Sequence, residues 1–568
     1  MLSCGMQQDR KSLSERNNTG MHCRTKQLSI YIYFLCCIVG TYTFALQNTP
    51  VGTAASPASR TMPPNVLLIM ADDLGFSDLG CYGGEIQTPN LDKLAINGMR
   101  FTQFYNTARC WPTRAALLTG YYAQQVKRDQ LPGIQRGKRP GWAPLLSARM
   151  ANLGYRCYHS GKWHLDGMPI QNGFHRSYLL KDQGRFFYPK VHYRDDRKLP
   201  AVAKGTDFYA TIGIANHAIE CLAEHKKQHP EQPFFHYLAF TAPHFPLHAL
   251  PQDIAKYSDT YRRGWDAVRS ARWKKINEIK LIQGKLSDTE PNVGPPYDFP
   301  DALEKLGPGE VNRPLSWAAL TQQQKKFQSE KMAIHAAMVD RMDQEIGRVI
   351  NQLKKMNALD NTLILFLSDN GASAEIMVRD DGHDPLAAPG SGDSYLCLGP
   401  GWSTVSNTPF RRHKTWVHEG GIRTPLIAHW PAGISAAGTK YGKQNPTAGH
   451  VIDMVPTLLE LAGGRLPKAS ANPTQPPPPF SGCSLLETFS GAHLKPTREI
   501  WWYHEGNRAL RVGKWKIVAA QGNPWSLFDL DTDPTETIDL ANQFPAELQS
   551  IVKLWKRQEK AILELHRN

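Results

Sequence analysis

Three short stretches of the chain are almost continuously apolar: 65–71 (NVLLIMA), 234–240 (FFHYLAF) and 362–367 (TLILFL). Their length suits strands, and the near absence of polar positions is typical of parallel strands that are buried on both faces. Residues 156–160 (RCYHS) predict a weaker fourth strand. Apolar residues recur at helical spacing in four other stretches: 115–118, 145–153, 209–227 and 322–356. This alternation predicts an α/β fold, with a large mixed, mostly parallel sheet sandwiched by helices.

The pattern changes in the last hundred residues. The composition shifts near residue 466, and 476–479 (PPPP) is a short stiff connector. Beyond it, the residues around Gly513 and Lys514 predict a hairpin, and 547–566 predicts an amphipathic terminal helix. We therefore expect a main domain at 65–465 and a smaller C-terminal α+β domain at 466–568. Within the main domain, 255–315 is charged and rich in Gly and Pro, which predicts a surface insertion with some helix.

The N-terminus carries the longest apolar stretch of the chain, from Leu28 to Leu46. Arg24 and Lys26 precede it, and residues 43–45 (TFA) are similar to a small-x-small cleavage site. We expect a leader at 1–46, with Met21 as a second plausible start, and a polar linker at 47–64. An uncleaved membrane anchor is the alternative, since the stretch almost reaches a membrane-spanning length.

Composition narrows the class of protein. The 568 residues are 41% hydrophobic and 21% charged, which suits a folded chain with a sizeable core. The net charge of +15 is spread along the chain, which weakens a nucleic-acid interpretation and favours anionic ligands. The six cysteines after the leader have no repeated spacing, so we expect no disulfide framework. The leader favours an exported protein, periplasmic or secreted. The absence of a usable Asn-x-Ser/Thr site after the leader favours a bacterial one.

Polar side chains follow two of the predicted strands directly. Asp72 and Asp73 come after the first strand, and Asp369 and Asn370 come after the third. Ligands bind at the carboxyl ends of strands in open α/β sheets, and adjacent carboxylates repel one another unless a cation lies between them. Four hard oxygen ligands without nitrogen or sulfur suit Ca²⁺, with Mg²⁺ as second choice. The alternative is that both sequences form turns or helix caps.

A cysteine motif supplies the second chemical signal. Cys110 opens the sequence CWPTRAALLTG, in which Pro112 and the apolar run predict a helix that begins near Cys110. The N–H groups and dipole of a helix N-terminus favour an anion there. Arg114 lies one turn further along the same face. The alternative is a buried cysteine in front of a helix.

The motif Cys-x-Pro-Thr-Arg with its following Thr-Gly resembles the sulfatase signature. Further ordered blocks are similar to the same family: 65–75, 88–94, 161–165, 242–246, 367–371, 407–431 and 450–463. The resemblance spans about 63–540, is weakest at 255–315, and implies an alkaline-phosphatase-like fold. It also implies hydrolysis of sulfate esters. In that family a formylglycine-generating enzyme oxidises the signature cysteine to an aldehyde, whose hydrate attacks sulfur and then expels sulfate.

The resemblance assigns roles residue by residue. Asp72, Asp73, Asp369 and Asn370 match the metal ligands, and modified Cys110 completes the shell. Arg114 matches the residue that holds the hydrate. Lys162 and His164, on one face if the backbone is extended, match a pair that contacts sulfate and the hydrate. His244 matches the histidine beside the leaving oxygen, and Lys414 matches the second sulfate-binding lysine.

Several points stay open at this stage. Asp166 replaces a Gly that is more usual in the family, and it is expected to pair with a basic group, to contact substrate, or to be a plain loop residue. Asp393, Tyr395 and Trp402 are candidate substrate contacts. The rival functions are a phosphonate or phosphodiester hydrolase of the same superfamily and a non-catalytic binder of sulfated glycans. The expected partners are a sulfated small molecule or glycan and the maturating enzyme, with no nucleic acid, and with a membrane only through an uncleaved leader.

Overall fold

The structure is a computed structural model that describes residues 62–379, 382–434, 442–464, 477–492 and 498–567. The predicted leader, nearly all of the predicted linker and the boundary at 465/466 lie outside the described residues, so these remain predictions. In the described part of the chain, no helix has the length and apolar character needed to cross a bilayer.

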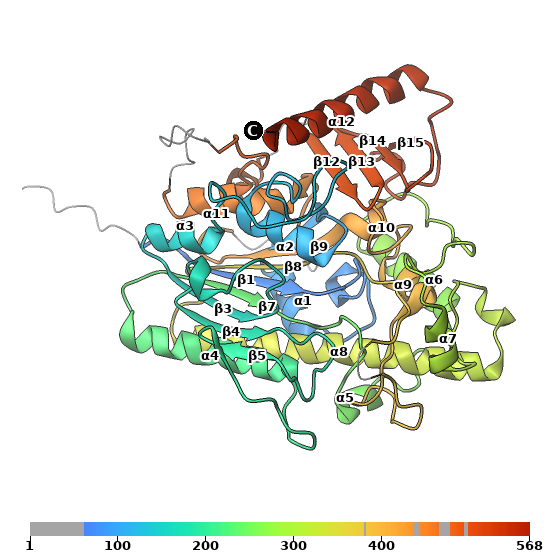
Figure 1. The fold of residues 1–568 in the computed structure, drawn as a ribbon, viewed down its shortest axis with the longest axis horizontal. Helices are drawn as coiled ribbons and strands as arrows, with labels where there is room; N and C mark the ends of the chain where they lie inside the picture. The colour runs from blue at the N-terminus through green and yellow to red at the C-terminus, as the bar shows by residue number, and fades with distance from the viewer. Residues whose placement is uncertain (1–61, 380–381, 435–441, 465–476, 493–497, 568) are drawn as a thin grey trace, which may run out of the picture. The chain divides into compact units, whose positions relative to one another are not determined.

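The apolar stretches form the centre of a large mixed sheet (Figure 1). Its order is β10-β2-β9-β8-β1-β7-β3-β4-β5-β6, with β11 also paired to β2. The five parallel central strands are β8 (Thr362–Ser368), β1 (Asn65–Ala71), β7 (Phe234–Ala239), β3 (Arg156–Gly161) and β4 (Arg176–Leu180). The remaining strands are β2 (Met99–Tyr105), β5 (His192–Arg194), β6 (Arg197–Lys198), β9 (Arg423–His429), β10 (Lys443–Asn445) and β11 (Gly449–His450). The predicted fold class and all four predicted strands are confirmed. The sheet is mixed because β9 pairs antiparallel with β2 and β8, and β5 pairs antiparallel with β4 and β6.

The central strand β1 shows why its sequence is apolar throughout. Leu67, Ile69 and Ala71 belong to one hydrophobic cluster, while Val66, Leu68 and Met70 belong to another. Successive side chains of a strand point to opposite faces of the sheet, so both faces of β1 are covered.

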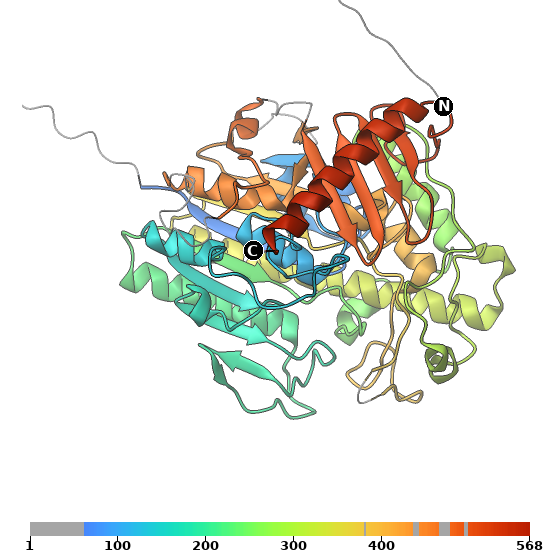
Figure 2. The ribbon, with the colours of Figure 1, turned by 45° about the horizontal axis from the view of Figure 1, so that its top comes forward.

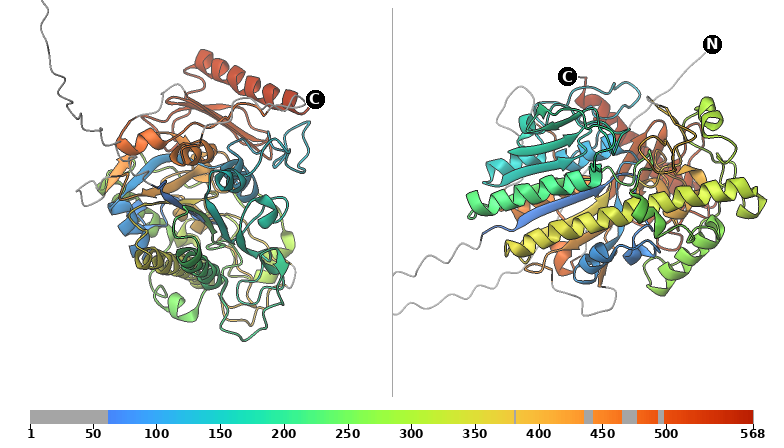
Figure 3. Two further views of the ribbon diagram at one scale, coloured as in Figure 1. Left: turned by 90° about the vertical axis from the view of Figure 1, so that its left-hand side faces the viewer. Right: turned by 90° about the horizontal axis from the view of Figure 1, so that it is seen from below.

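Helices cover both faces of the sheet. On one face, α4 (Ala210–Gln228) and α8 (Gln322–Lys355) lie side by side (Figure 3). A capping box between Thr321 and Gln324 fixes the start of α8. On the other face lie α2 (Cys110–Thr119), α3 (Leu146–Asn152) and α11 (Met454–Leu461). Shorter or peripheral helices are α1 (Pro89–Ile96), α5 (Pro251–Ala255), α9 (Gly399–Ser406) and α10 (Glu419–Ile422).

The C-terminal region forms an antiparallel sheet of four strands: β12 (Glu499–His504), β13 (Asn507–Val512), β14 (Trp515–Ala519) and β15 (Ser526–Asp529). The terminal helix α12 (Pro545–Leu565) lies across it (Figure 2). The predicted hairpin and terminal helix are therefore present. Trp501 and Trp555 share a hydrophobic cluster with Val66 of β1, so the core is continuous between the two sheets.

The segment 255–315 is not confined to the surface. It contains α6 (Trp265–Glu278) and α7 (Pro300–Leu306). Trp265 and Val268 are buried in the main core, and the buried guanidinium of Arg272 lies 2.8 Å from Asp78. The charged character that predicted a surface insertion reflects in part this buried ion pair.

Candidate active site

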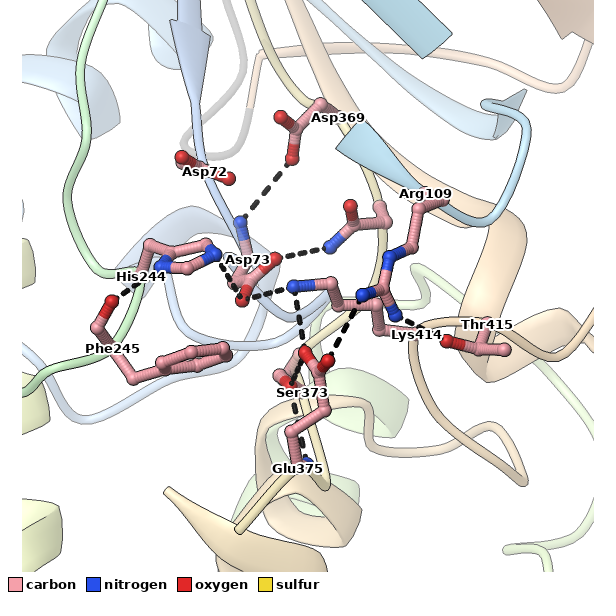
Figure 4. Close-up of polar contacts among 12 residues, drawn as sticks. Asp72, Asp73, Arg109, His244, Phe245, Asp369, Ser373, Glu375, Lys414 and Thr415 are labelled. Carbon is pink, nitrogen blue, oxygen red and sulfur yellow. Dashed lines mark hydrogen bonds and ion pairs between the residues drawn. The ribbon is translucent and has the colours of Figure 1, made fainter. Parts of the chain in front are cut away.

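The loops that follow β1 and β8 meet at the carboxyl edge of the sheet, because these two strands are parallel neighbours. The Asp73 N–H donates to Asp369 Oδ1 at 3.3 Å, and the Asn370 side chain donates to Asp73 Oδ1 at 2.6 Å (Figure 4). Asp72, Asp73, Asp369 and Asn370 are all buried. The structure thus brings together the four predicted oxygen ligands.

The chemistry of this cluster fits a hard cation. Asp72 Oδ1 and Asn370 Oδ1 are buried without a hydrogen-bond partner, although such atoms are normally satisfied. Burial and the neighbouring Asp369 raise the pKa of Asp72, which reflects a repulsion that a cation would relieve. Ligand atoms of Asp72, Cys110 and Asp369 lie within 4.8 Å of one another.

Cys110 is the first residue of α2, as predicted. Arg109 before it is extended, with φ −150° and ψ 152°, so the thiol lies where the free N–H groups of the helix begin. One turn later, Arg114 donates from Nε and Nη2 to Asp369 Oδ2 at 2.9 and 2.7 Å. Arg114 therefore fixes the helix end against the acidic cluster.

Lys162 and His164 follow β3 but do not share an extended face. Lys162 Nζ donates to Asp72 Oδ2 at 2.5 Å. His164 has φ 58°, in the left-handed region, so the prediction from extended spacing is wrong for this pair. The His164 side chain is half-buried, and its ring packs edge-on against Trp111 with centroids 5.8 Å apart. Burial, together with Lys162 and Arg114, lowers the pKa of His164 well below its usual range.

His244 and Lys414 reach the cluster from two other loops. His244 Nδ1 hydrogen-bonds the carbonyl of Phe245, so Nε2 faces the site at 3.7 Å from Asp73 Oδ2. Burial lowers the pKa of His244 to about 4. Lys414 Nζ lies 2.8 Å from Asp73 Oδ2 and 2.9 Å from Glu375 Oε2. Burial opposes the charge on Lys414, but Asp73 and Glu375 outweigh it and raise the pKa of Lys414 above its usual range.

Two buried groups of the site were missed in the sequence. Glu375 accepts from Arg109 Nη2 at 3.0 Å and from Ser373 Oγ at 2.8 Å, in addition to its contact with Lys414 (Figure 4). Arg109 also donates to Thr415 Oγ1 at 2.8 Å. For Arg109, its position next to Cys110 was the one hint in the sequence that it belongs to the site. Glu375, five residues after Asn370, lies in no motif that points to the site.

The candidate substrate contacts have different outcomes. Asp166 pairs with Arg128 and Arg139 at 3.6 and 3.7 Å, which confirms the basic-partner interpretation. Asp393 and Tyr395 line a cavity. Trp402 is wrong as a substrate contact, because it is fully buried in the core and donates to the Gln328 carbonyl at 2.7 Å.

Three kinds of group lie together at this edge of the sheet: carboxylates that could hold a cation, buried lysines that could bind an anion, and a cysteine at a helix N-terminus. Such a combination suits an enzyme that cleaves an anionic ester. Within the described residues, His244 is the one histidine in a potential metal-binding group. The site formed by these residues therefore lacks the histidine ligands that a pair of zinc ions would need.

Known proteins share both the sequence and the fold. Residues 64–464 match the Sulfatase family model. The chain is 31% identical over 554 residues to an uncharacterised sulfatase of Schizosaccharomyces pombe, covering 88% of this chain and 94% of the relative. It is 32% identical over 463 residues to the arylsulfatase of Klebsiella aerogenes, covering 75% and 92%. The solved structure of Ps i-CgsB with k-i-k-neocarrahexaose has a TM-score of 0.61 at 24% identity, covering 88% and 93%.

The chain therefore belongs to the sulfatase family and is a sulfuric ester hydrolase. The family resemblance and the enzyme class inferred from the sequence are confirmed.

Proposed function

We propose that the protein hydrolyses sulfate esters with a formylglycine formed from Cys110 and a Ca²⁺ ion. The observation that carries the proposal is the position of Cys110. Its sulfur lies in the same compact group as carboxylate oxygens of Asp72 and Asp369, at a helix N-terminus. A residue placed there can be a nucleophile and a metal ligand at the same time.

The cation would be held by four residues: Asp72, Asp73, Asp369 and Asn370. Of their oxygens, Asp72 Oδ1 and Asn370 Oδ1 have no hydrogen-bond partner and are therefore available as ligands. Ca²⁺ would neutralise sulfate oxygens and favour a deprotonated hydroxyl at position 110. The hydrated aldehyde at position 110 would supply that hydroxyl as the nucleophile. Arg114 would keep Asp369 and the start of α2 in register, since it contacts both the acidic cluster and the helix that carries Cys110.

The remaining groups bind and orient the ester. Lys162 and Lys414 each place a buried ammonium beside the acidic cluster, where the oxygens of a sulfate group would bind. His244 is held by the Phe245 carbonyl with Nε2 free toward the site, a suitable place for the leaving oxygen. His164 is half-buried against the ring of Trp111, the residue that follows Cys110, and would contact the sulfate or the hydrate from there.

The substrate class is a sulfated aryl compound or saccharide. Relatives named arylsulfatase and structures crystallised with a carrahexaose or with D-glucosamine-2-N,6-O-disulfate support this range. We also propose export from the cell, supported by the apolar leader, and maturation by a formylglycine-generating enzyme, supported by the signature around Cys110.

The proposal is tested by kcat/KM for 4-nitrophenyl sulfate, a phosphonate monoester and a phosphodiester, with protein co-produced with a formylglycine-generating enzyme. We expect the sulfate to be the preferred substrate and Cys110→Ala to abolish its turnover. Preference for either phosphorus ester, or undiminished activity of Cys110→Ala, would contradict the proposal.

A further inference from the structure

A cavity adjoins the site on the side of His244. The rings of His244 and Phe245 lie against each other, with centroids 4.2 Å apart, and Phe245 packs in one hydrophobic cluster with Tyr395. Tyr395 in turn lines a cavity of about 250 Å³. The Lys414 ammonium and the Arg379 guanidinium both lie within 5.5 Å of the Phe245 ring centroid. One aromatic ring therefore separates the proposed sulfate-binding lysine from the wall of this cavity.

The hollow extends beyond the first cavity. A second hollow, of about 450 Å³, shares Arg185, Arg379 and Tyr395 with the first and adds Lys181 and Lys190 to its lining. Either hollow is larger than a sulfate ion alone would need. Phe245 packs against both His244 and Tyr395, so a substrate that extends from His244 past this ring would reach the cleft that the two hollows form.

Two of the acidic side chains that line the cleft pair with basic ones, whereas one basic side chain has no acidic partner among the described residues. Asp182 lies 3.1 Å from Arg185, and Asp393 pairs with Lys204 and accepts from the Tyr188 hydroxyl at 2.7 Å. Asp384 accepts the N–H of Leu386 at 2.9 Å and is exposed. Among the described residues, the Arg379 guanidinium has no hydrogen-bond or ion-pair partner, and it contacts the Phe245 ring. Arg379 is thus an exposed cation that the described protein groups do not neutralise.

We propose that this cleft is a binding subsite for a second anionic group of the substrate, with Arg379 as the residue that recognises it. The proposal rests on the sulfatase activity proposed above and narrows the substrate class to an anionic oligosaccharide with more than one charged group. A guanidinium matches both sulfate and carboxylate, because its N–H groups form a planar fork that bonds two oxygens. The paired Asp393, Lys204 and Tyr188 offer donors and acceptors for sugar hydroxyls.

The test uses inhibition of 4-nitrophenyl sulfate hydrolysis by three hexasaccharides: a heparin hexasaccharide with sulfates and carboxylates, oligogalacturonate with carboxylates only, and neutral maltohexaose. These probes need not be substrates. Arg379→Ala is compared with Arg262→Ala, which removes an exposed arginine that lines a different hollow. We expect Arg379→Ala to raise the inhibition constant of an anionic hexasaccharide by about 10- to 100-fold, the value of a hydrogen bond to a charged group. Arg262→Ala should leave it unchanged.

The pattern across the probes identifies the anionic group. A loss confined to the heparin hexasaccharide indicates that Arg379 requires sulfate, and a loss for both anionic probes indicates that a carboxylate is enough. The subsite proposal would be overturned if Arg379→Ala and Arg262→Ala had the same inhibition constants for the anionic probes. It would also be overturned if neither anionic probe inhibited the wild-type enzyme. Should neither 4-nitrophenyl sulfate nor a sulfated saccharide be hydrolysed at all, the proposed function fails instead. Calorimetric binding of the same probes to Cys110→Ala, with and without Arg379→Ala, then decides the subsite separately.

Discussion

Replacement of Glu375 by Gln tests how the site keeps Lys414 in place. Glu375 is fully buried and bonds both Lys414 and Arg109, at 2.9 and 3.0 Å (Figure 4). A lysine ammonium has three N–H donors. Asp73 and Glu375 take two of those on Lys414, which leaves one for the substrate. Without the charge of Glu375, we expect Lys414 to shift toward Asp73 and the guanidinium of Arg109 to lose its buried counter-ion.

The size of the effect follows from these contacts. Breaking a buried ion pair costs about 3–5 kcal/mol, and the amide oxygen of Gln can still accept one of the two hydrogen bonds. We therefore expect the free energy of unfolding to fall by about 3 kcal/mol. Removal of one donor to a reacting oxyanion costs about 10²–10³ in rate. Because Lys414 is displaced rather than removed, kcat/KM should fall by about 10- to 100-fold.

The assay pairs urea unfolding with kcat/KM for 4-nitrophenyl sulfate. Glu345→Gln is the matched control, since Glu345 is a buried carboxylate with two arginine partners on α8, away from the acidic cluster. It should lose stability and keep its activity. The reasoning is refuted if Glu375→Gln loses stability to the same degree as the control but retains wild-type kcat/KM.

Three further predictions use other groups of the molecule. Asp72→Ala should lower Ca²⁺ content and activity together, and elemental analysis that finds two Zn²⁺ per chain would instead favour a phosphatase. His244→Ala should slow sugar sulfates more than 4-nitrophenyl sulfate, by about 10²–10⁴, because a poor leaving group needs a proton. Lys414→Ala should slow the hydrolysis of both kinds of sulfate to a similar degree. If Lys414→Ala instead slowed sugar sulfates more and His244→Ala slowed both kinds equally, the roles of the two residues would be exchanged. Burial favours the neutral form of Asp78, but His335 and Arg272 outweigh this and hold the pKa of Asp78 well below its usual range. The ionised Asp78 therefore stabilises the fold above about pH 4, and this stabilisation is lost as the pH falls. Asp78→Asn should therefore be less stable at pH 7 and show a flatter pH dependence in urea unfolding below pH 4.

The centre of the fold was predictable because its strands are buried on both faces. That burial makes β1, β7 and β8 almost continuously apolar, and the ends of β1 and β8 then locate Asp72 and Asp369. Strand β2 was not predicted, since it carries Arg100, whose buried guanidinium interrupts the apolar pattern.

The remaining parts of the site depend on tertiary contacts that leave no local pattern. Glu375 is 266 positions from Arg109 and 39 from Lys414 in the sequence, so no spacing rule connects the three. The left-handed backbone of His164 likewise belongs to the turn after β3, where residue spacing alone suggested an extended chain. Trp402 packs against Trp265 of α6 and donates to the Gln328 carbonyl of α8, although it was a candidate substrate contact in the sequence.

The central claim is that residue 110 acts as a formylglycine and not as a thiol. The most direct measurement is mass spectrometry of the peptide that contains Cys110, taken from protein with measured sulfatase activity. The account predicts the aldehyde or its hydrate, in a fraction that rises in proportion to the specific activity of each preparation. A fully active preparation in which residue 110 carries only the free thiol would contradict it.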